Sequence, residues 1–318
     1  MNEMIQQAVT ILKQGGLVAM PTETVYGLAA DASNPAAVKK IYEAKGRPSS
    51  HPVIVHIASI EQMDGWARDV PQNVKNALAE FWPGPLTIIC KKAPHVSTEL
   101  TGGQDTVGIR VPNHPVAQCL LQAFGGGLAA PSANRFGRIS PTAAADVKAE
   151  LGEKVDLILE GGRSKVGIES TILDISQKPY RILRLGAISA KQLSQSLGEP
   201  VEELIDAKST IRAPGMLASH YAPITPVQLI ASEKLQAELS KLVHNHDSIG
   251  LLTHSKLDLG LATIRYVHAS SNPERYAHEL YANLRLLDSE AHTVIVVEAV
   301  PDTAEWAAIA DRLKRAAY

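Results

Sequence analysis

Hydroxyl-bearing side chains gather in three short segments of this sequence, and each segment adjoins an apolar run that predicts a strand. Residues 21–28 (PTETVYGL) follow the apolar run 17–20, residues 130–134 (APSAN) follow a second run, and residues 167–172 (GIESTI) lead into a third. Polar loops at strand ends often bind small polar ligands. Taken alone, each segment is explained as well by a turn whose threonine or serine caps a helix.

Two arginines stand inside predicted strands. Arg110 and Arg184 are each flanked on both sides by leucine, isoleucine or valine. Because a buried guanidinium needs a partner, Arg110 either lies on the solvent-facing side of its strand or binds a ligand carboxylate through its planar fork.

Further basic residues could contact phosphate. Residues 45–48 (KGRP) end a predicted helix, where the simpler interpretation is a glycine stop with basic residues favourable to the helix dipole. The alternative is a phosphate clamp. Arg135 and Arg138 follow residues 130–134, which suggests either a phosphate cradle or a polar loop that leads to the N-cap Thr142.

Composition and missing motifs exclude several classes. The chain has 318 residues, 45% hydrophobic and 20% charged, with a net charge of −2. It is long enough for two domains. Its net charge is too low for binding nucleic acid through overall positive charge, although a local basic groove is compatible with this charge. No Walker loop, histidine metal motif or serine nucleophile elbow is present. The sequence GGGLAA at 125–130 precedes a strand, so it is not a dinucleotide fingerprint.

Location is inferred from the cysteines and the N-terminus. Cys90 and Cys119 fit no metal spacing, and Cys119 is expected to be a buried core thiol. We find no signal peptide and no apolar run of about 20 residues. A cytoplasmic protein without a membrane span is therefore expected.

The periodicity predicts two domains. Helices are expected at 2–14, 34–46, 74–82, 115–123, 142–151 and 189–198, and strands at 17–20, 52–57, 86–90, 107–111, 128–130, 157–159, 171–175 and 181–185. Later, strands at 227–231, 249–252, 264–267 and 294–298 alternate with helices at 234–243, 273–287 and 303–314. We expect an α/β (α+β) protein. It has a twisted mixed-sheet domain over 1–200, a linker or lid over 201–224 without clean periodicity, and a smaller Rossmann-like open-sheet domain over 225–318.

The segments stand in the order found in the YrdC-like family. They are residues 21–28, 45–48, 52–57, 82–87, 107–112, 130–134, 167–172 and 183–186. The motifs APGM at 213–216 and HYAP at 220–223, followed by a Rossmann-like domain, resemble the long two-domain form of that family, the threonylcarbamoyl-AMP synthases.

The resemblance implies a nucleotidyltransferase that joins L-threonine, bicarbonate or CO2, and ATP into L-threonylcarbamoyladenylate and pyrophosphate. In such a family other proteins then transfer the threonylcarbamoyl group to tRNA. The implied threonine contacts are Thr24, His56, Arg110, Ala130 and Ser170. The implied ATP contacts are Arg47, His51, Thr106, Ser132, Ser140, Arg184 and Tyr221. The family usually has asparagine where this chain has His51, so the charge at this contact depends on pH.

These residue types fit that chemistry. Arg110 would hold the threonine carboxylate, and a carbamate oxygen would attack the α-phosphate in line. Arg47, Arg184 and Mg²⁺ would stabilise the charge, with Lys45 as a further candidate, and no metal ligand from the protein is expected. The linker that carries Tyr221 is expected to close over the site and exclude water.

Two other functions are compatible with the sequence. One is a non-catalytic RNA-binding module that uses Arg47, Arg135 and Arg138, against which the near-neutral charge and few aromatics weigh. The other is a carbamoyl-handling enzyme that uses carbamoyl phosphate, which the linker and C-terminal domain disfavour. Direct tRNA contact and oligomeric state are left open.

Overall fold

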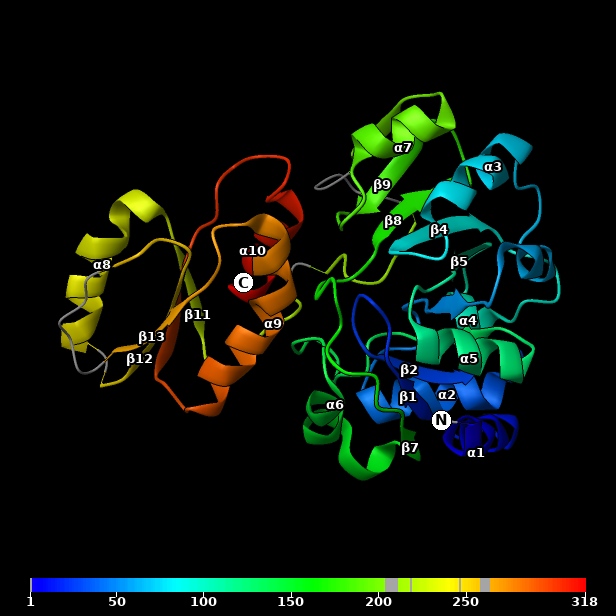
Figure 1. The fold of residues 1–318 in the computed structure, drawn as a ribbon, viewed down its shortest axis with the longest axis horizontal. Helices are drawn as coiled ribbons and strands as arrows, with labels where there is room; N and C mark the ends of the chain where they lie inside the picture. The colour runs from blue at the N-terminus through cyan, green and yellow to red at the C-terminus, as the bar shows by residue number, and fades with distance from the viewer. Residues whose placement is uncertain (1, 204–210, 218, 246, 258–263) are drawn as a thin grey trace. The chain divides into compact units, whose positions relative to one another are not determined.

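The computed structural model describes residues 2–203, 211–217, 219–245, 247–257 and 264–318, and it divides into two compact units (Figure 1). The first unit comprises Met1–Phe136, Pro141–Lys165 and Glu169–Met216. The second comprises Gly137–Ser140, Val166–Ile168 and Leu217–Tyr318. The last of the passages between the units, after Met216, lies in the predicted linker 201–224, of which residues 204–210 and 218 are outside the described residues.

The first unit is built on a ten-stranded mixed sheet with the order β10-β9-β8-β4-β5-β3-β6-β2-β1-β7. Among the described residues, four neighbouring pairs are parallel (β9 with β10, β4 with β8, β3 with β5, β1 with β7) and the other five are antiparallel. The mixed sheet that the sequence predicts is confirmed. Its strands are β1 Val18–Met20, β2 Gly27–Asp31, β3 Ile54–His56, β4 Leu86–Lys91, β5 Thr106–Arg110, β6 Leu128–Ala129, β7 Leu157–Ile158, β8 Thr171–Asp174, β9 Tyr180–Arg184 and β10 Val201–Glu203.

Capping residues mark the ends of two helices of this unit, α2 and α7. Asn34 caps α2 through its side chain, Ser189 forms a capping box with Gln192, and Gly46 ends α2 in the left-handed conformation at φ 62°. The helical elements are α1 Asn2–Lys13, α2 Pro35–Lys45, η1 Ile60–Gly65, α3 Gln72–Phe81, α4 Thr98–Thr101, α5 Pro115–Phe124, α6 Ala144–Leu151, η2 Gly152–Lys154 and α7 Ala190–Leu197.

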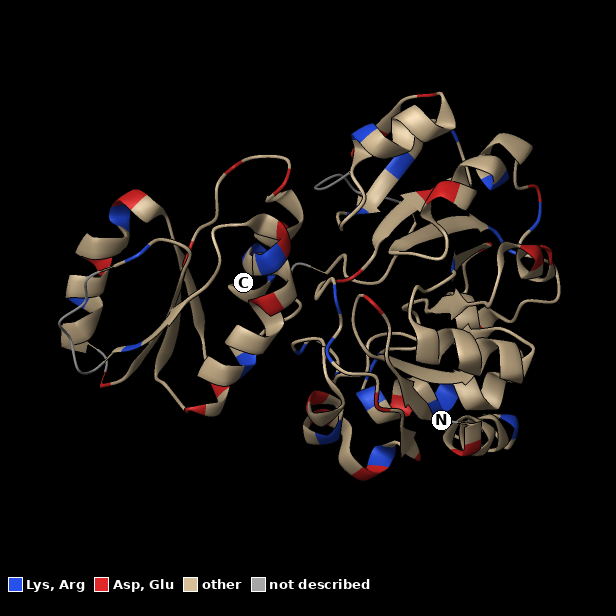
Figure 2. Ribbon diagram, in the orientation of Figure 1, with Lys and Arg blue, Asp and Glu red and all other residues tan. Residues whose placement is uncertain are grey.

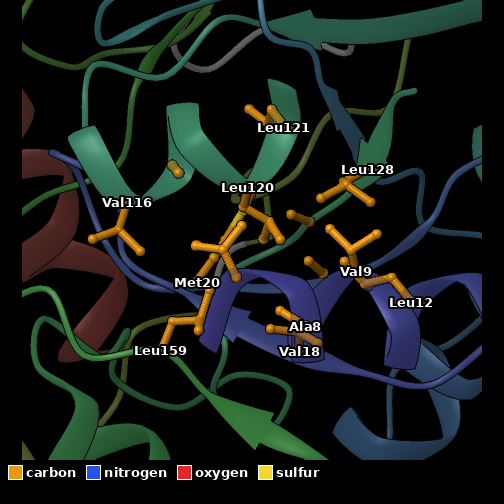
Figure 3. Packing of buried hydrophobic residues seen from close by; sticks show 14 residues of the cluster. Ala8, Val9, Leu12, Val18, Met20, Val116, Leu120, Leu121, Leu128 and Leu159 are labelled. Carbon is orange, nitrogen blue, oxygen red and sulfur yellow. The ribbon is translucent and has the colours of Figure 1, made fainter. Parts of the chain in front are cut away.

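One hydrophobic cluster fixes helices α1 and α5 against the sheet. Leu12 of α1 and Leu120 of α5 are fully buried in the same cluster as Met20, which ends β1 (Figure 3). Burial of aliphatic side chains of this size stabilises a fold by about 1.5–3 kcal/mol each. The cluster therefore holds β1 rigidly, and β1 leads directly into the polar loop at residues 21–26.

The second unit contains an all-parallel sheet with the order β11-β14-β12-β13. Its elements are β11 Val227–Ile230, α8 Ser232–Asn245, β12 Ile249–Thr253, β13 Ile264–His268, α9 Pro273–Ser289, β14 Val294–Glu298 and α10 Ala307–Ala316. The strands β12 and β14 are buried throughout, as is usual for a parallel sheet covered by helices. The predicted Rossmann-like open-sheet domain is confirmed.

Some expectations are wrong. Strand β2 was not predicted, since residues up to Leu28 were expected to form a loop. Strand β10 lies in the segment that was predicted to be a linker. Both strands are short and lack a clear alternation of apolar and polar residues. Helix α10 begins at Ala307 rather than near residue 303. Helix α6 is capped at Ala143 rather than Thr142, because Asp146 accepts from both backbone amides.

The expectation of a buried thiol at residue 119 is also wrong. Cys119 is exposed, whereas Cys90 is buried. At about 100° per residue, Cys119 points about 130° away from the centre of the buried face of α5. That face is formed by Val116, Ala117, Leu120 and Leu121.

Candidate active site

The loop between β1 and β2 is shaped by its own hydroxyls. Thr22 Oγ1 donates to the carbonyl oxygen of Val25 at 2.6 Å and lies 2.8 Å from Thr24 Oγ1. The amides of Thr24 and Val25 donate back to Thr22 Oγ1 at 3.2 Å. These bonds satisfy buried backbone groups. Thr22 thus closes a turn, as the simpler interpretation expected, but the turn leads into strand β2 and caps no helix. The same turn orients Thr24.

Arg110 ends strand β5 and is the centre of the first cluster of site residues. Only 4% of Arg110 is exposed, so of the two alternatives that the sequence left for this residue, the solvent-facing side of the strand is excluded. Its Nε donates to the carbonyl oxygen of Gly84 at 3.1 Å and its Nη1 to Thr24 Oγ1 at 2.8 Å. Its Nη2 lies 2.7 Å from Glu23 Oε1. This last contact is an ion pair rather than an aligned hydrogen bond.

His56 ends strand β3 beside Arg110. The two residues are register partners on parallel strands, so their side chains lie on the same face of the sheet. Burial, followed by the Arg110 charge, lowers the pKa of His56 to about 3. The imidazole is therefore neutral near pH 7. Its Nδ1 has no hydrogen-bond partner among the described residues and is available to a ligand.

Ala130 follows strand β6 and is held by a backbone bond from its amide to the carbonyl oxygen of Ile54, at 2.9 Å. Ile54 begins β3, two residues before His56. The structure thus brings Thr24, His56, Arg110 and Ala130 onto adjoining strands and the loop that precedes β2. Four of the five residues implied as threonine contacts form one neighbourhood.

The fifth, Ser170, lies beside the start of strand β4. Its hydroxyl lies 2.8 Å from Thr87 Oγ1. The amide of Thr171 donates to the carbonyl oxygen of Pro85 at 3.0 Å, next to the Gly84 carbonyl that accepts from Arg110. The segment before β4 therefore connects Ser170 to Arg110. A Cβ at Gly84 would lie 2.2 Å from a backbone oxygen, so this position requires glycine.

Arg184 donates hydrogen bonds both to Ser170 and to Pro214, which follows the strands of the sheet in the sequence. Its Nε and Nη2 donate to the carbonyl and the hydroxyl of Ser170, both at 3.0 Å, and its Nη1 donates to the carbonyl oxygen of Pro214 at 3.1 Å. A residue implied as an ATP contact is thus bonded directly to one implied as a threonine contact.

Lys45 braces a loop. Its amino group donates to the carbonyl oxygens of Ser132, at 2.6 Å, and Asn134. Burial, followed by the Arg47 charge, lowers the pKa of Lys45 well below its usual value. The glycine stop at Gly46 is confirmed, but the Lys45 side chain reaches across to residues 132–134 rather than to the end of its own helix.

Arg47 and His51 lie around the ring of Phe136. The guanidinium of Arg47 is 5.8 Å from the centre of that ring and donates to the carbonyl oxygen of Pro52 at 2.9 Å. His51 meets the ring edge-on at 5.4 Å between centroids. Burial, followed by the charges of Arg47 and Arg212, lowers the pKa of His51. Its imidazole is therefore neutral near pH 7, as the amide of asparagine would be.

Thr106 begins strand β5 and lies on the same face as Arg110, four residues along the strand. It lines a small pocket with neighbours from three other segments. The lining residues are Pro52, Val53, Ile54, Ile89, Gln104, Thr106, Gly108, Arg212 and Pro214. The carbonyl of Pro52 also accepts from Arg47, so this pocket adjoins a residue implied as an ATP contact.

Ser140 and Tyr221 belong to the second unit. Ser140 is fully buried. Tyr221 has a positive φ of 63°, stacks on Tyr281 at 5.9 Å between ring centres and lies 5.2 Å from the Arg312 guanidinium.

Within the described ranges, no group of three or more histidine, cysteine, aspartate or glutamate side chains is arranged to hold a metal ion. Among the same residues, no helix is long and apolar enough to cross a membrane.

Three residues of these clusters were assigned no function from the sequence. Glu23 pairs with Arg110, Thr87 contacts Ser170, and Arg212 lines the pocket with Thr106. Glu23 and Thr87 lie inside the segments 21–28 and 82–87 that carry the family resemblance, which was the available signal. For Arg212 the sequence offered none, because its position depends on how residues 211–216 pack against the sheet.

Sequence comparison identifies two families along the chain. The Sua5/YciO/YrdC family, described as "Telomere recombination", matches residues 10–186. The C-terminal domain of threonylcarbamoyl-AMP synthase matches residues 188–318. The threonylcarbamoyl-AMP synthase of Pyrococcus abyssi is 35% identical over 98% of this chain and 93% of its own length. That of Bacillus subtilis is 39% identical over 98% and 92%.

Structure comparison agrees. The P. abyssi Sua5 protein complexed with L-threonine matches with a TM-score of 0.90 at 35% identity, over 98% of this chain and 94% of that protein. Escherichia coli YciO matches with a TM-score of 0.54 at 25% identity and covers 61% of this chain, against 94% of its own. The chain therefore belongs to the Sua5/YciO/YrdC family, in the two-domain form that carries the C-terminal domain of threonylcarbamoyl-AMP synthases.

Proposed function

We propose that this chain is an L-threonylcarbamoyladenylate synthase, a nucleotidyltransferase that forms threonylcarbamoyl-AMP and pyrophosphate from L-threonine, bicarbonate or CO2, and ATP. The observation that carries the proposal is the buried Arg110 beside Thr24 and the neutral His56. Relatives of full-chain similarity bear the name of this activity. The product would serve proteins that modify tRNA.

Threonine would bind through Arg110. The guanidinium has five N–H donors, and those of Nε and one of Nη1 are bonded to Gly84 and Thr24. Among the described residues, a donor on Nη1 and one on Nη2 are left for a carboxylate. The hydroxyls of Thr24 and Ser170 and the orphaned Nδ1 of His56 could then fix the amino and hydroxyl groups.

ATP would enter as its Mg²⁺ complex. The described residues offer no carboxylate cluster, so the Mg²⁺ ligands would be phosphate oxygens and water, as is common for this ion. When bound, the ion would neutralise phosphate charge. Arg47, His51, Thr106, Ser132 and Arg184, with Ser140 and Tyr221 of the second unit, are proposed to contact ATP. Lys45 would hold Ser132 in place rather than touch phosphate.

Positioning and charge stabilisation would supply most of the rate. The carbamate of threonine attacks the α-phosphate in line, an oxygen–phosphorus bond forms, and pyrophosphate leaves. Arg47 and Arg184 would stabilise the negative charge on the phosphates. Since carbamates hydrolyse readily, the linker with Tyr221 is proposed to exclude water as a lid.

The test is to incubate the purified protein with ATP, Mg²⁺, bicarbonate and each amino acid in turn, and to measure pyrophosphate and the mass of the adenylate. Release with threonine, and a product of the threonylcarbamoyl-AMP mass, are expected. Release with serine and not threonine would overturn the substrate. RNA affinity without ATP consumption would instead support the RNA-binding module. Acidic and basic residues are interspersed over both units, which is less suited to such a module (Figure 2).

A further inference from the structure

Glu23 is a buried acid next to the residue proposed to bind the threonine carboxylate. It is 5% exposed, and its Oε1 lies 2.7 Å from Arg110 Nη2. Among the described residues, neither of its carboxylate oxygens accepts a hydrogen bond. A buried charge persists when an opposite charge compensates its lost hydration. Glu23 is therefore held by the guanidinium, and its position depends on Arg110.

The dependence also runs the other way. Arg110 is held at three atoms: Nε by the Gly84 carbonyl, Nη1 by the Thr24 hydroxyl and Nη2 by Glu23. The first two partners are neutral, so Glu23 supplies the negative charge. Three fixed points on a planar group determine its orientation. The donors that are left on Nη1 and Nη2 then form the fork that receives a carboxylate bidentately.

We propose that Glu23 is a positioning residue: it orients the Arg110 guanidinium and balances its charge, and it acts on threonine only through Arg110. This inference rests on the proposed function. The Glu23–Arg110 pair is neutral as a whole and so matches an amino acid, which is a neutral zwitterion near pH 7. Without Glu23, the guanidinium is a buried charge with neutral partners, and water or a rotated side chain replaces the fork.

The test uses equilibrium binding of three ligands to the full-length protein. L-Threonine has both charged groups, 2,3-dihydroxybutanoate lacks the amino group, and L-threoninol lacks the carboxylate. In Glu23→Ala and Glu23→Gln, threonine and dihydroxybutanoate should each bind about tenfold more weakly, which corresponds to about 1.4 kcal/mol. Threoninol should bind as to the wild type. Weaker binding of threoninol with unchanged dihydroxybutanoate would overturn the proposal, because Glu23 would then contact the ammonium.

A double-mutant cycle gives a second, independent reading. If Glu23 acts through Arg110, Glu23→Ala in an Arg110→Ala background should weaken threonine binding no further. If the double variant instead loses threonine affinity by the product of the two single-variant factors, the proposal would be overturned. Glu23→Asp, which keeps a carboxylate, should restore part of the affinity.

Folding controls distinguish a positioning role of Glu23 from a general loss of the folded state. Thermal unfolding is measured for every variant, and Glu23→Gln keeps the side-chain volume should Glu23→Ala fail to fold. Glu160→Gln is the matched control, because it removes an exposed carboxylate of the same unit that does not contact Arg110. Wild-type protein that does not bind threonine would refute the proposed function itself. Wild-type protein that binds it, with Glu23→Gln binding equally well, would overturn only the positioning role.

Discussion

Arg184 at the end of β9 donates hydrogen bonds from Nε to the carbonyl oxygen of Ser170 and from Nη2 to its hydroxyl, both at 3.0 Å. Ser170 is proposed to contact threonine and Arg184 to contact ATP. A change at either residue therefore removes or alters a direct hydrogen-bond partner of the other. Two sites that share a bond in this way are expected to be thermodynamically coupled, and the coupling is reciprocal.

Ser170→Ala should weaken the binding of both substrates, because Arg184 loses an acceptor in addition to the lost contact with threonine. A hydrogen bond from a charged guanidinium contributes about 1.5–3 kcal/mol, so we expect a loss of about tenfold or more for each. Titrations of threonine and of ATP measure it. Ser176→Ala, which removes a hydroxyl bonded to Asp174 at the far end of β8, is the control. Loss of affinity for a single substrate would contradict the coupling.

Arg110→Ala should raise the KM for threonine far more than the KM for ATP. A hydrogen bond to a charged group contributes about 1.5–3 kcal/mol. Arg110→Lys keeps the charge and loses the planar fork, so it should rescue only part of the effect. Steady-state pyrophosphate release with each substrate varied measures both constants. An equal rise in both would argue against the assignment of Arg110 to threonine.

Lys45→Met should destabilise the first unit and weaken ATP binding. The substitution removes the Lys45 donor from the carbonyls of Ser132 and Asn134, and loss of a hydrogen bond to a charged group costs about 1.5–3 kcal/mol. Differential scanning calorimetry and ATP titration measure the two effects. Lys40→Met is the matched control, since Lys40 lies on the same helix and donates to Gly15. A variant of normal stability that loses only turnover would instead indicate direct contact with phosphate.

Stability should fall in acid because of His56. Its pKa is about 3 in the folded protein, against 6.5 for an unperturbed histidine, so the folded state resists protonation and the unfolded state accepts it. The stabilisation is present in full above pH 6.5 and is lost as the pH falls toward 3, at about 1.4 kcal/mol per pH unit. Urea unfolding at about pH 7 and about pH 5, on either side of the unfolded pKa, measures it. His56→Gln should show a smaller difference, and His95→Gln, which removes an exposed ring, should not. If the free energy of unfolding falls equally between about pH 7 and about pH 5 in the wild type and in His56→Gln, the acid sensitivity does not come from His56.

The sequence was sufficient for the large elements and for residues carried by a family motif. Helices α2 and α7 were predictable because Asn34 and Ser189 are strong caps and glycines end both helices. The buried strands β12 and β14 were predictable as continuous apolar runs. Such signals are local, so they survive without knowledge of the tertiary structure.

What the sequence could not supply is the pairing of side chains that are distant along the chain. Glu23 and Arg110 are 87 residues apart, and Thr87 and Ser170 are 83 apart. Lys45 looked like a residue for the end of its own helix, but its amino group bonds to carbonyls that only the fold brings near. Strands β2 and β10 were missed because their short segments form through neighbouring strands rather than through their own alternation.

Residues 211–216 have a consequence for recombination between relatives. Ala213 packs with Ile54, Ile89, Ile172 and Leu183 of the sheet, and Ile211 and Met216 lie against the same cluster. Gln104 exchanges two hydrogen bonds with the backbone of Arg212, at 2.7 and 3.0 Å. A chimera that joins the first unit of this chain to the C-terminal domain of a relative should therefore place its crossover after Met216. A junction near residue 200 would give residues 211–216 the sequence of the relative, although these residues pack against the sheet of the first unit.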